Sequence, residues 1–461
     1  MERQVVFGDS VVSATLPVRT EVVSQGISVP LEPTQDLVAT VQSALDAPID
    51  TPPLLELARG ARRVVLAFDD PTVPCYAPLW ATAVPLILRT LERAGVPDGG
   101  IRLICANALH RMFEHDELAN ILGSDVVARY ADRLSCHDAE DPDAIETVGT
   151  TESGHPVELN RAVTDSDLTI YLNCSTVRGF SGGWKSVCVG LSTYRSIHRH
   201  HTPDIMSMSL DRNKMHAILD EMGAVVDANL GEHRVFKLET VLANPFMVHD
   251  VYGGTVGATR SAALDRLRTV MPERRSLTEE KASIVVYGVP DWSPYAAFSH
   301  GNPILDLIST GLGYLGGMIQ ALGAPGCTVV MATPARERWD HSHHASYPVV
   351  WERVLPVTRD PDEARSSFEP ELAADEALIE RYRTGYSFHP VHAVMALYPL
   401  KRLRHAGRVI IAGAEDPAIP EHCGFGSATT IEAAIAEAET IHGKDAPIAF
   451  VDNPAAANRS R

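Results

Sequence analysis

Short, nearly continuous runs of valine, isoleucine and leucine recur along the chain, and polar residues, glycine or proline follow each run. A strand with one face in water would alternate apolar and polar residues, whereas a strand covered on both faces does not need to. These runs therefore predict buried strands of parallel sheets. The predicted strands span residues 63–68, 101–105, 168–172, 284–287, 328–331, 408–411 and 447–451.

Segments compatible with helices separate several of these strands. Residues 78–94 lie between the first two strands, and residues 427–442 form an alanine-rich stretch with Ser and Thr at its start. A chain of 461 residues is too long for one ordinary core. The expected fold is α/β with two lobes, each a mostly parallel sheet flanked by helices, and with the active site in the cleft between them. The boundary is expected near residues 272–278, which divides the chain into domains 1–274 and 275–461.

The overall charge limits the classes of partner. With 40 Lys and Arg against 59 Asp and Glu, the net charge is −19, which argues against binding nucleic acid or an anionic membrane through a broad basic surface. No apolar run approaches the length of a membrane span, and the first residues lack the apolar core of a signal peptide. The seven cysteines include no CxxC pair, so neither a disulfide framework nor a structural zinc site is indicated. A cytoplasmic protein is expected.

A glycine-rich segment ending in lysine is the clearest candidate for ligand binding. It reads Gly179-Phe180-Ser181-Gly182-Gly183-Trp184-Lys185, and its backbone amides could face an anion. The segment departs from a nucleoside-triphosphate P-loop because Trp184 replaces the glycine before the lysine. A tight turn with an incidental lysine is the simpler interpretation, and spacing alone does not decide between the two.

Histidines form two clusters. His201 lies sixteen residues after Lys185, at the end of the His198-Arg199-His200-His201 run, and could return to the same cavity as a metal ligand. A solvated helix end is expected for His198 and His200, since the spacing of helical zinc pairs is absent. A second cluster, residues 339–344, is expected to be a solvated loop.

Polar residues follow three of the predicted strands, where α/β sheets bind their ligands. Asp70 follows the first, His110 the second and Ser175 the third. His110 is well placed for general acid/base chemistry near neutral pH, although a lone histidine is more often structural. Asp70 or Thr72 could instead only cap the next helix.

Together these pieces resemble the lactate racemase family, whose members use a nickel-pincer nucleotide. The specific part of the resemblance is residues 179–185 with a histidine sixteen residues later. Supporting segments are Val6-Phe7-Gly8, Ala44-Leu45-Asp46-Ala47-Pro48-Ile49, residues 52–58, residues 69–72, Leu109-His110-Arg111 and Ser427-Ala428-Thr429-Thr430-Ile431.

The resemblance implies a role for each matching residue. Lys185 would hold the cofactor through a thioamide bond, His201 would complete the nickel coordination, and His110 would be one of two catalytic histidines. Asp70 and Thr72 would line the cofactor or substrate pocket. The glycine-rich loop would contact the cofactor through Gly179, Ser181, Gly182 and Gly183. The first domain would anchor the cofactor and carry out catalysis, while the second would close the substrate cleft. Proteins that synthesise the cofactor would be partners.

The activity that this resemblance implies is that of an isomerase: racemisation or epimerisation of a 2-hydroxy acid by reversible hydride transfer to the cofactor. The chain departs from the family where substrate is bound. Ser175 stands where the racemases carry their second catalytic histidine, and Val73 where they carry an arginine that grips the substrate carboxylate. The alignment places His300 at the family's substrate lysine, so His300 is the candidate for the second acid/base. Simple lactate is therefore not the expected substrate.

Three residues could restore the missing positive charge, and spacing selects none of them: Arg111, Arg178 and His300. Three other functions stay open. The same cofactor could serve a hydride transfer or elimination that does not racemise its substrate. The loop 179–185 could belong to a phosphate- or nucleotide-binding protein without redox chemistry. Residues 198–201 could form the zinc site of a hydrolase.

Overall fold

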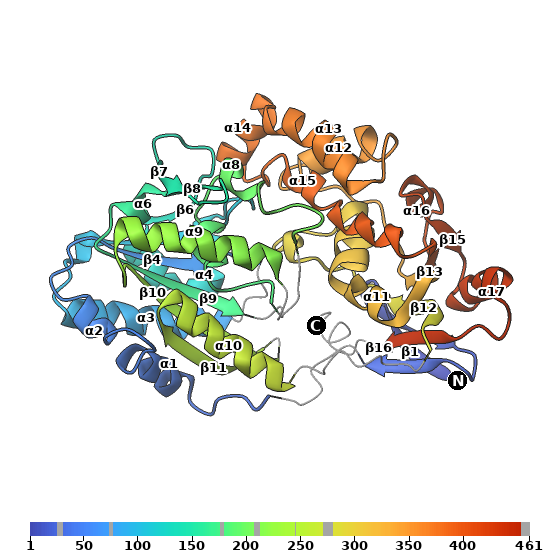
Figure 1. Cartoon of the computed structure of the whole chain (residues 1–461), viewed down its shortest axis with the longest axis horizontal. Coiled ribbons are helices and arrows are strands. Elements are labelled where there is room, and N and C mark those ends of the chain that lie inside the picture. Colours follow the sequence, from blue (N-terminus) through green and yellow to red (C-terminus); the bar gives the residue numbers. More distant parts are fainter. Residues whose placement is uncertain are drawn as a thin grey trace. The chain divides into compact units, whose positions relative to one another are not determined.

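The predicted apolar runs form the inner strands of two mostly parallel sheets in a computed structural model of the chain (Figure 1). The structure describes residues 1–24, 31–72, 77–175, 179–206, 213–244, 246–270 and 280–452, without the side chains of Ser24, Ala77 and Ser175. The chain divides into two units. We call Val29–Met271 with Tyr382–Tyr386 the N-terminal unit, and Met1–Ser28, Pro272–Arg381 and Ser387–Arg461 the C-terminal unit.

The N-terminal unit contains a six-stranded sheet in the order β11-β10-β9-β4-β5-β6. Its strands are parallel except for the pair β10 and β11. They are β4 (Val64–Asp69), β5 (Ile101–Ala106), β6 (Leu134–Cys136), β9 (Leu168–Ser175), β10 (Val235–Asn244) and β11 (Met247–Gly254). A separate antiparallel pair joins β7 (Ile145–Thr150) and β8 (Pro156–Asn160). All six residues of β4 are buried, as its uninterrupted apolar run predicts.

Helices cover this sheet. One large apolar cluster joins strand residues to Trp80, Ile87 and Leu91 of α3, and a smaller cluster includes Ala263 and Leu267 of α10. The helices of the N-terminal unit are α1 (Leu37–Asp46), α2 (Leu54–Leu57), α3 (Ala77–Arg93), α4 (His115–Leu122), α5 (Ser124–Tyr130), α6 (Arg161–Thr164), α7 (Lys185–Cys188), α8 (Tyr194–Ile197), α9 (Lys214–Leu230), α10 (Val256–Val270) and the 3₁₀ turn η1 (Asp98–Gly100).

The C-terminal unit contains a second six-stranded sheet, in the order β15-β14-β13-β12-β16-β3, and all its strand pairs are parallel. The strands are β3 (Glu21–Ser24), β12 (Ala282–Gly288), β13 (Gly323–Ala332), β14 (Arg408–Ala412), β15 (Gly426–Ala428) and β16 (Ile448–Asp452), with a separate antiparallel pair, β1 (Glu2–Phe7) and β2 (Ser10–Thr15). The helices are η2 (Pro294–Ala296), the π-helix η3 (Ile304–Leu315), η4 (Gly316–Met318), α11 (Ile319–Leu322), α12 (Ser346–Arg353), α13 (Pro361–Ala373), α14 (Glu376–Thr384), whose last three residues fall in the N-terminal unit, α15 (His392–Met395), η5 (Tyr398–Arg404), α16 (Ala418–His422) and α17 (Ile431–His442).

The α/β fold class, with parallel sheets flanked by helices, is confirmed, and two details differ from the prediction. Residues 1–28 were expected in the first domain, but β3 pairs with β16, and these residues belong to the C-terminal unit. The helix expected from residue 427 begins at Ile431, because 426–428 forms β15 and the side chain of Thr430 caps the helix by accepting from the Ala433 amide. The expected boundary at 272–278 lies outside the described residues.

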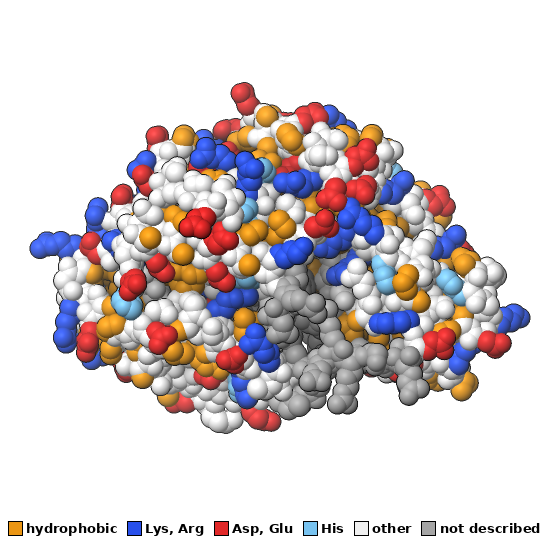
Figure 2. Space-filling view, viewed as in Figure 1, with side chains coloured by type: hydrophobic (Ala, Val, Ile, Leu, Met, Phe, Trp, Pro, Cys, Tyr) orange, Lys and Arg blue, Asp and Glu red, His pale blue; other side chains and the backbone are white. Residues whose placement is uncertain are grey.

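The distribution of surface charge and the lengths of the helices bear on the classes of partner. Acidic and basic side chains are intermixed on the face shown in Figure 2. Within the described ranges, no helix is long and apolar enough to cross a membrane.

A buried histidine near the candidate site makes the stability depend on pH. His137 is fully buried; its Nε2 donates to the Ser192 carbonyl oxygen at 2.9 Å, and its Nδ1 accepts from Asn160 Nδ2 at 3.1 Å. Burial lowers the pKa of His137 from 6.5 to about 4.

As the pH falls below 6.5, the unfolded chain takes up a proton on residue 137 before the folded chain does. The free energy of unfolding should therefore drop by up to about 3 kcal/mol between pH 6.5 and 4 through this residue. Urea unfolding of the native chain and of the His137→Asn variant across this range should show a shallower pH dependence for the variant. Identical slopes would contradict the assignment.

Candidate functional site

Three adjacent strands of the N-terminal unit end beside the predicted catalytic residues. β9, β4 and β5 are neighbours in the sheet, so Asp70 and His110 follow strand ends that meet at the same edge. Ser175 is the last residue of β9 and pairs in register with Val241 of β10. The parallel order therefore gathers segments that are distant in the sequence.

His110 and Asp70 form a hydrogen-bonded pair at this edge. His110 Nδ1 lies 2.7 Å from Asp70 Oδ2. Because a carboxylate only accepts, Nδ1 donates, and in the neutral ring the lone pair is then on Nε2. Asp70 is 2% exposed and His110 22% exposed, so the carboxylate is buried behind an accessible ring. This arrangement suits a general base whose tautomer is set by its partner.

Thr72 completes the arrangement. Its amide donates to Asp70 Oδ1 at 2.7 Å, its hydroxyl also donates to that oxygen, and its Oγ1 lies 2.9 Å from His110 Nδ1. The sequence predicted Asp70 and Thr72 as pocket or helix-capping residues. It gave no sign of their contact with His110, because residues 70 and 110 meet only through the pairing of β4 with β5.

A tight turn presents His110. The His110 amide donates to the Asn107 carbonyl oxygen at 2.7 Å, and Asn107 Nδ2 donates back to the His110 carbonyl oxygen at 3.1 Å. Ala108 has a positive φ of 51°, an uncommon conformation that side chains other than glycine adopt at a cost. The Tyr382 hydroxyl lies 3.3 Å from the Ala108 carbonyl oxygen and accepts from the Ala139 amide at 2.9 Å. Hydrogen bonds from Asn107 and Tyr382 therefore hold the turn in place.

The glycine-rich loop is held by side chains that bind its carbonyl groups. Arg260 donates to the Ser181 carbonyl oxygen at 2.7 Å and to that of Gly179 at 3.0 Å, and His216 Nε2 donates to the Phe180 carbonyl oxygen at 3.0 Å. Gly183 has a φ of 57°, and a Cβ there would lie 2.3 Å from Arg260 Cδ, so only glycine fits. The buried Ser181 Oγ has no hydrogen-bond partner among the described residues, which leaves one polar group of the loop for a ligand.

Lys185 follows this loop at the start of α7. Its side chain is partly buried, and its Nζ lies 4.5 Å from the centre of the Phe180 ring. Burial lowers the pKa of the Lys185 ammonium, and the charges of Asp69 and Asp70 oppose this shift. An amine that is more readily neutral is more nucleophilic.

Two buried charged residues of β10 form hydrogen bonds with the loop and with α7. Lys237 is fully buried and donates to the Ser186 hydroxyl, and its Nζ lies 3.8 Å from Glu239 Oε2. Glu239 Oε2 in turn accepts from the Gly183 amide at 3.1 Å. Burial lowers the pKa of Lys237 to about 8. The sequence did not single out Lys237 or Glu239, which lie on β10, a strand that it did not predict.

His201 is buried in the same unit, with 8% exposure. Burial and the nearby charges of His200, Lys185 and His110 hold the pKa of His201 well below its ordinary value. The imidazole is therefore neutral near pH 7, the form in which histidine binds metals. His200 was expected to be solvated, and this is wrong: it is fully buried, and its Nδ1 lies 2.9 Å from His201 Nδ1. The described residues contain no group of three His, Cys, Asp or Glu placed to hold a metal, so the alternative of a zinc hydrolase gains no support from this segment.

Two further candidate residues, Arg111 and His300, differ in their surroundings. The buried Arg111 binds both carboxylate oxygens of Glu117, at 2.9 and 2.6 Å, and its guanidinium lies 4.2 Å from the Phe113 ring centre. Its charge is thus engaged within the fold. His300 is exposed in the C-terminal unit, and its Nδ1 donates to the Gly301 carbonyl oxygen at 3.0 Å. Val73, Arg178 and the side chain of Ser175 lie outside the described residues.

The second histidine cluster is only partly the solvated loop that was expected. His341 is exposed, but His344 is fully buried and its Nε2 donates to the Tyr295 carbonyl oxygen at 2.8 Å. His343 Nδ1 lies 2.9 Å from Asp340 Oδ2. The loop expectation fails because α12 begins two residues after His344 and packs into the core through Tyr347 and Val350.

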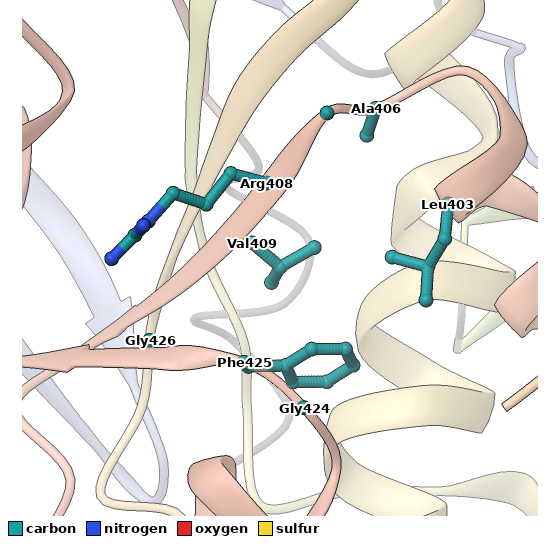
Figure 3. A pocket seen from close by; sticks show the side chains of 8 residues that line it. Leu403, Ala406, Arg408, Val409, Gly424, Phe425 and Gly426 are labelled. Carbon is teal, nitrogen blue, oxygen red and sulfur yellow. The ribbon is translucent and has the colours of Figure 1, made fainter. Parts of the chain in front are cut away.

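A pocket in the C-terminal unit lies apart from all these residues. It has a volume of about 460 Å³, and Leu403, Val409 and Phe425 line it beside Arg408 (Figure 3). The Arg408 guanidinium is ion-paired with Glu437. None of the residues predicted for the site lines this pocket.

Comparison with known proteins relates the N-terminal part of the chain to lactate racemases. Residues 7–212 match the lactate racemase N-terminal domain. The chain is 33% identical over 182 residues to a lactate racemase of Lactiplantibacillus plantarum, which covers 38% of this chain and 42% of that protein. It is 26% identical over 223 residues to a lactate racemase of Thermoanaerobacterium thermosaccharolyticum, covering 46% and 50%.

These sequence matches therefore span half or less of the two racemases. The fold match is longer. The lactate racemase apoprotein from Thermoanaerobacterium thermosaccharolyticum superposes with a TM-score of 0.70 at 18% identity, over 99% of both chains. The matched domain includes Asp70, His110, Lys185 and His201. Residues 7–212 are thus related to the lactate racemase N-terminal domain, and the whole chain shares the fold of the lactate racemase apoprotein.

Proposed function

We propose that this protein is a racemase or epimerase of a 2-hydroxy acid other than simple lactate, and that a nickel-pincer nucleotide is bound covalently at Lys185. The observation that carries the proposal is that one unit of the fold brings together the His110–Asp70 pair, Lys185 and His201. His110 and Lys185 both contribute to the electrostatic environment of His201, which supports placing the three groups in one site.

The residues present fit such a cofactor. A partly buried amine with a lowered pKa suits acylation, and a buried neutral imidazole suits one metal coordination position. Because the described residues offer no complete set of metal ligands, the other donors would come from the cofactor itself. Ser181 Oγ and the glycine-rich turn would face the cofactor's phosphate. When bound, the nickel-pincer nucleotide supplies the acceptor for the hydrogen on the substrate's α-carbon.

The chain's own residues would transfer the proton of the substrate hydroxyl and bind the substrate carboxylate. The lone pair of His110 Nε2 takes the proton of the substrate hydroxyl, and Asp70 stabilises the imidazolium that forms. The tight turn at Asn107 and Ala108 keeps the ring in this orientation. For racemisation, a second acid/base must act on the opposite face, and His300 is the proposed group. Since Arg111 is paired with Glu117, Arg178 or His300 is the proposed partner of the substrate carboxylate.

The departure at residue 175 favours a second candidate function. If no group replaces the second histidine, the same site would oxidise or dehydrate its substrate from one side only. The proteins that synthesise the cofactor would be required partners in either case.

The proposal is tested by producing the chain together with a nickel-pincer biosynthesis system. We expect an intact mass with one covalent adduct at Lys185 and about one nickel ion per chain. Single enantiomers of 2-hydroxy acids with different side chains are then incubated in deuterated water and analysed by chiral chromatography. Formation of the opposite enantiomer supports racemisation. Accumulation of a keto or dehydrated product from a single retained configuration supports the second function. No adduct, when a control lactate racemase is loaded under the same conditions, contradicts both.

A further inference from the structure

His200 and His201 are joined by a hydrogen bond between their rings. Their Nδ1 atoms lie 2.9 Å apart, and the ring centres are 4.9 Å apart at an interplanar angle of 63°. Two nitrogens at this distance need one proton between them, so one ring donates and the other accepts. The two rings therefore hold complementary tautomers.

We propose that His200 is a positioning residue that fixes the tautomer of His201, so that Nε2 of His201 is left as the metal-binding atom. The inference rests on the proposed function, in which His201 completes the nickel coordination. His201 Nδ1 is occupied by the contact with His200, so coordination falls to Nε2, which must then carry the lone pair. The proton of His201 lies on Nδ1 and is donated to His200 Nδ1. Histidines that bind metals commonly donate their other ring nitrogen in this way.

The burial of His200 supports this role. The ring is fully buried, and its Nε2 has no hydrogen-bond partner among the described residues. In the proposed tautomer this nitrogen carries the ring's proton. Burying such a donor without a partner is unfavourable, so the contact with His201 is the polar interaction that the described residues give this ring. The backbone holds the two rings in place, since both amides donate to the Ile197 carbonyl oxygen at the end of α8, at 3.1 and 3.0 Å.

Two substitutions separate the hydrogen bond from simple packing. In His200→Asn the side-chain oxygen can still accept from His201 Nδ1, whereas in His200→Leu nothing can. His198→Asn is the matched control, because His198 follows the same helix and its ring packs against Tyr194. Each protein is co-produced with the cofactor, and its intact mass and nickel content are measured before and during exposure to EDTA. Thermal melting verifies that each variant is folded.

We expect all four proteins to carry the adduct, since Lys185 is unchanged. The His200→Leu protein should lose nickel about 10–100-fold faster than the native chain, while His200→Asn and His198→Asn should lose it at nearly the native rate. Equal nickel loss from His200→Leu and the native chain would overturn the inference while leaving the proposed function intact.

A second measurement needs no cofactor. ¹⁵N–¹H correlation spectra of the histidine rings in the metal-free protein, with the His201 signals assigned through His201→Asn, report which nitrogen carries the proton. We expect the Nδ1–H form of His201 in the native chain and a loss of that form in His200→Leu. An Nε2–H form in the native chain would overturn the inference. Because this readout does not depend on loading, it decides the role of His200 even if the native chain acquires no adduct and the proposed function fails.

Discussion

Replacing Lys185 with methionine is expected to abolish attachment of the cofactor. The intact mass should show no adduct, and the activity should fall by about 10⁶-fold or more, to the uncatalysed rate, because the cofactor carries the difficult step. The physical reason is that Lys185 supplies the only proposed covalent link. Its amine lies at the end of a loop whose carbonyl groups are bound by Arg260 and His216, which fixes the position of Lys185.

Lys214→Met is the matched control. Lys214 is exposed at the start of α9, so the same loss of charge there should leave the adduct and the activity unchanged. Circular dichroism and thermal melting would verify that both variants are folded. An adduct of the same mass in Lys185→Met, located on another residue by peptide mapping, would refute the assignment of Lys185.

Removing the His110 ring is expected to lower kcat by about 10²–10⁴-fold while the adduct and nickel content stay at native levels. His110→Ala removes the proposed base. Asp70→Asn should have a smaller effect in the same direction, because an amide can donate to Nδ1 and so favour the tautomer with a protonated Nε2. Both variants change proton transfer at the substrate hydroxyl and leave Lys185 and His201 in place.

The control for His110 is His115→Ala, since His115 is exposed at the start of α4. Steady-state kinetics, together with the nickel content and intact mass of each variant, separate a catalytic defect from a loading defect. If His110→Ala keeps native kcat, His110 has no part in the mechanism. If it loses the cofactor, its role is in binding.

The fold follows closely from local patterns. Seven apolar runs predicted strands of the two mostly parallel sheets, because strands buried on both faces are typically apolar along their length. The helix between the first two strands was predicted to within one residue at each end. By contrast, β10 was missed even though eight of its ten residues are buried. Its buried Lys237 and Glu239 interrupt the apolar run, and their charges are satisfied by each other, by the Ser186 hydroxyl and by the Gly183 amide.

For residues 1–28, local sequence likewise failed to predict which sheet they join. These residues were assigned to the first domain by their place in the chain, yet β3 is an edge strand of the C-terminal sheet. A strand needs a partner for its backbone hydrogen bonds, and local sequence does not say which partner that is.

The sequence by itself determined the chemistry available to this protein: the glycine-rich loop, the lysine that ends it, the histidine sixteen residues later and the polar residues after the strands. Residue types and short spacings are written in the chain, and so is the family resemblance that they carry. Only the tertiary structure decided which of these groups act on one another. Pairing of β4 with β5 places Asp70 within hydrogen-bonding distance of His110. Packing buries His200 against His201 and pairs Arg111 with Glu117. Contacts of this kind depend on strand order and on burial, which are properties of the whole packed fold.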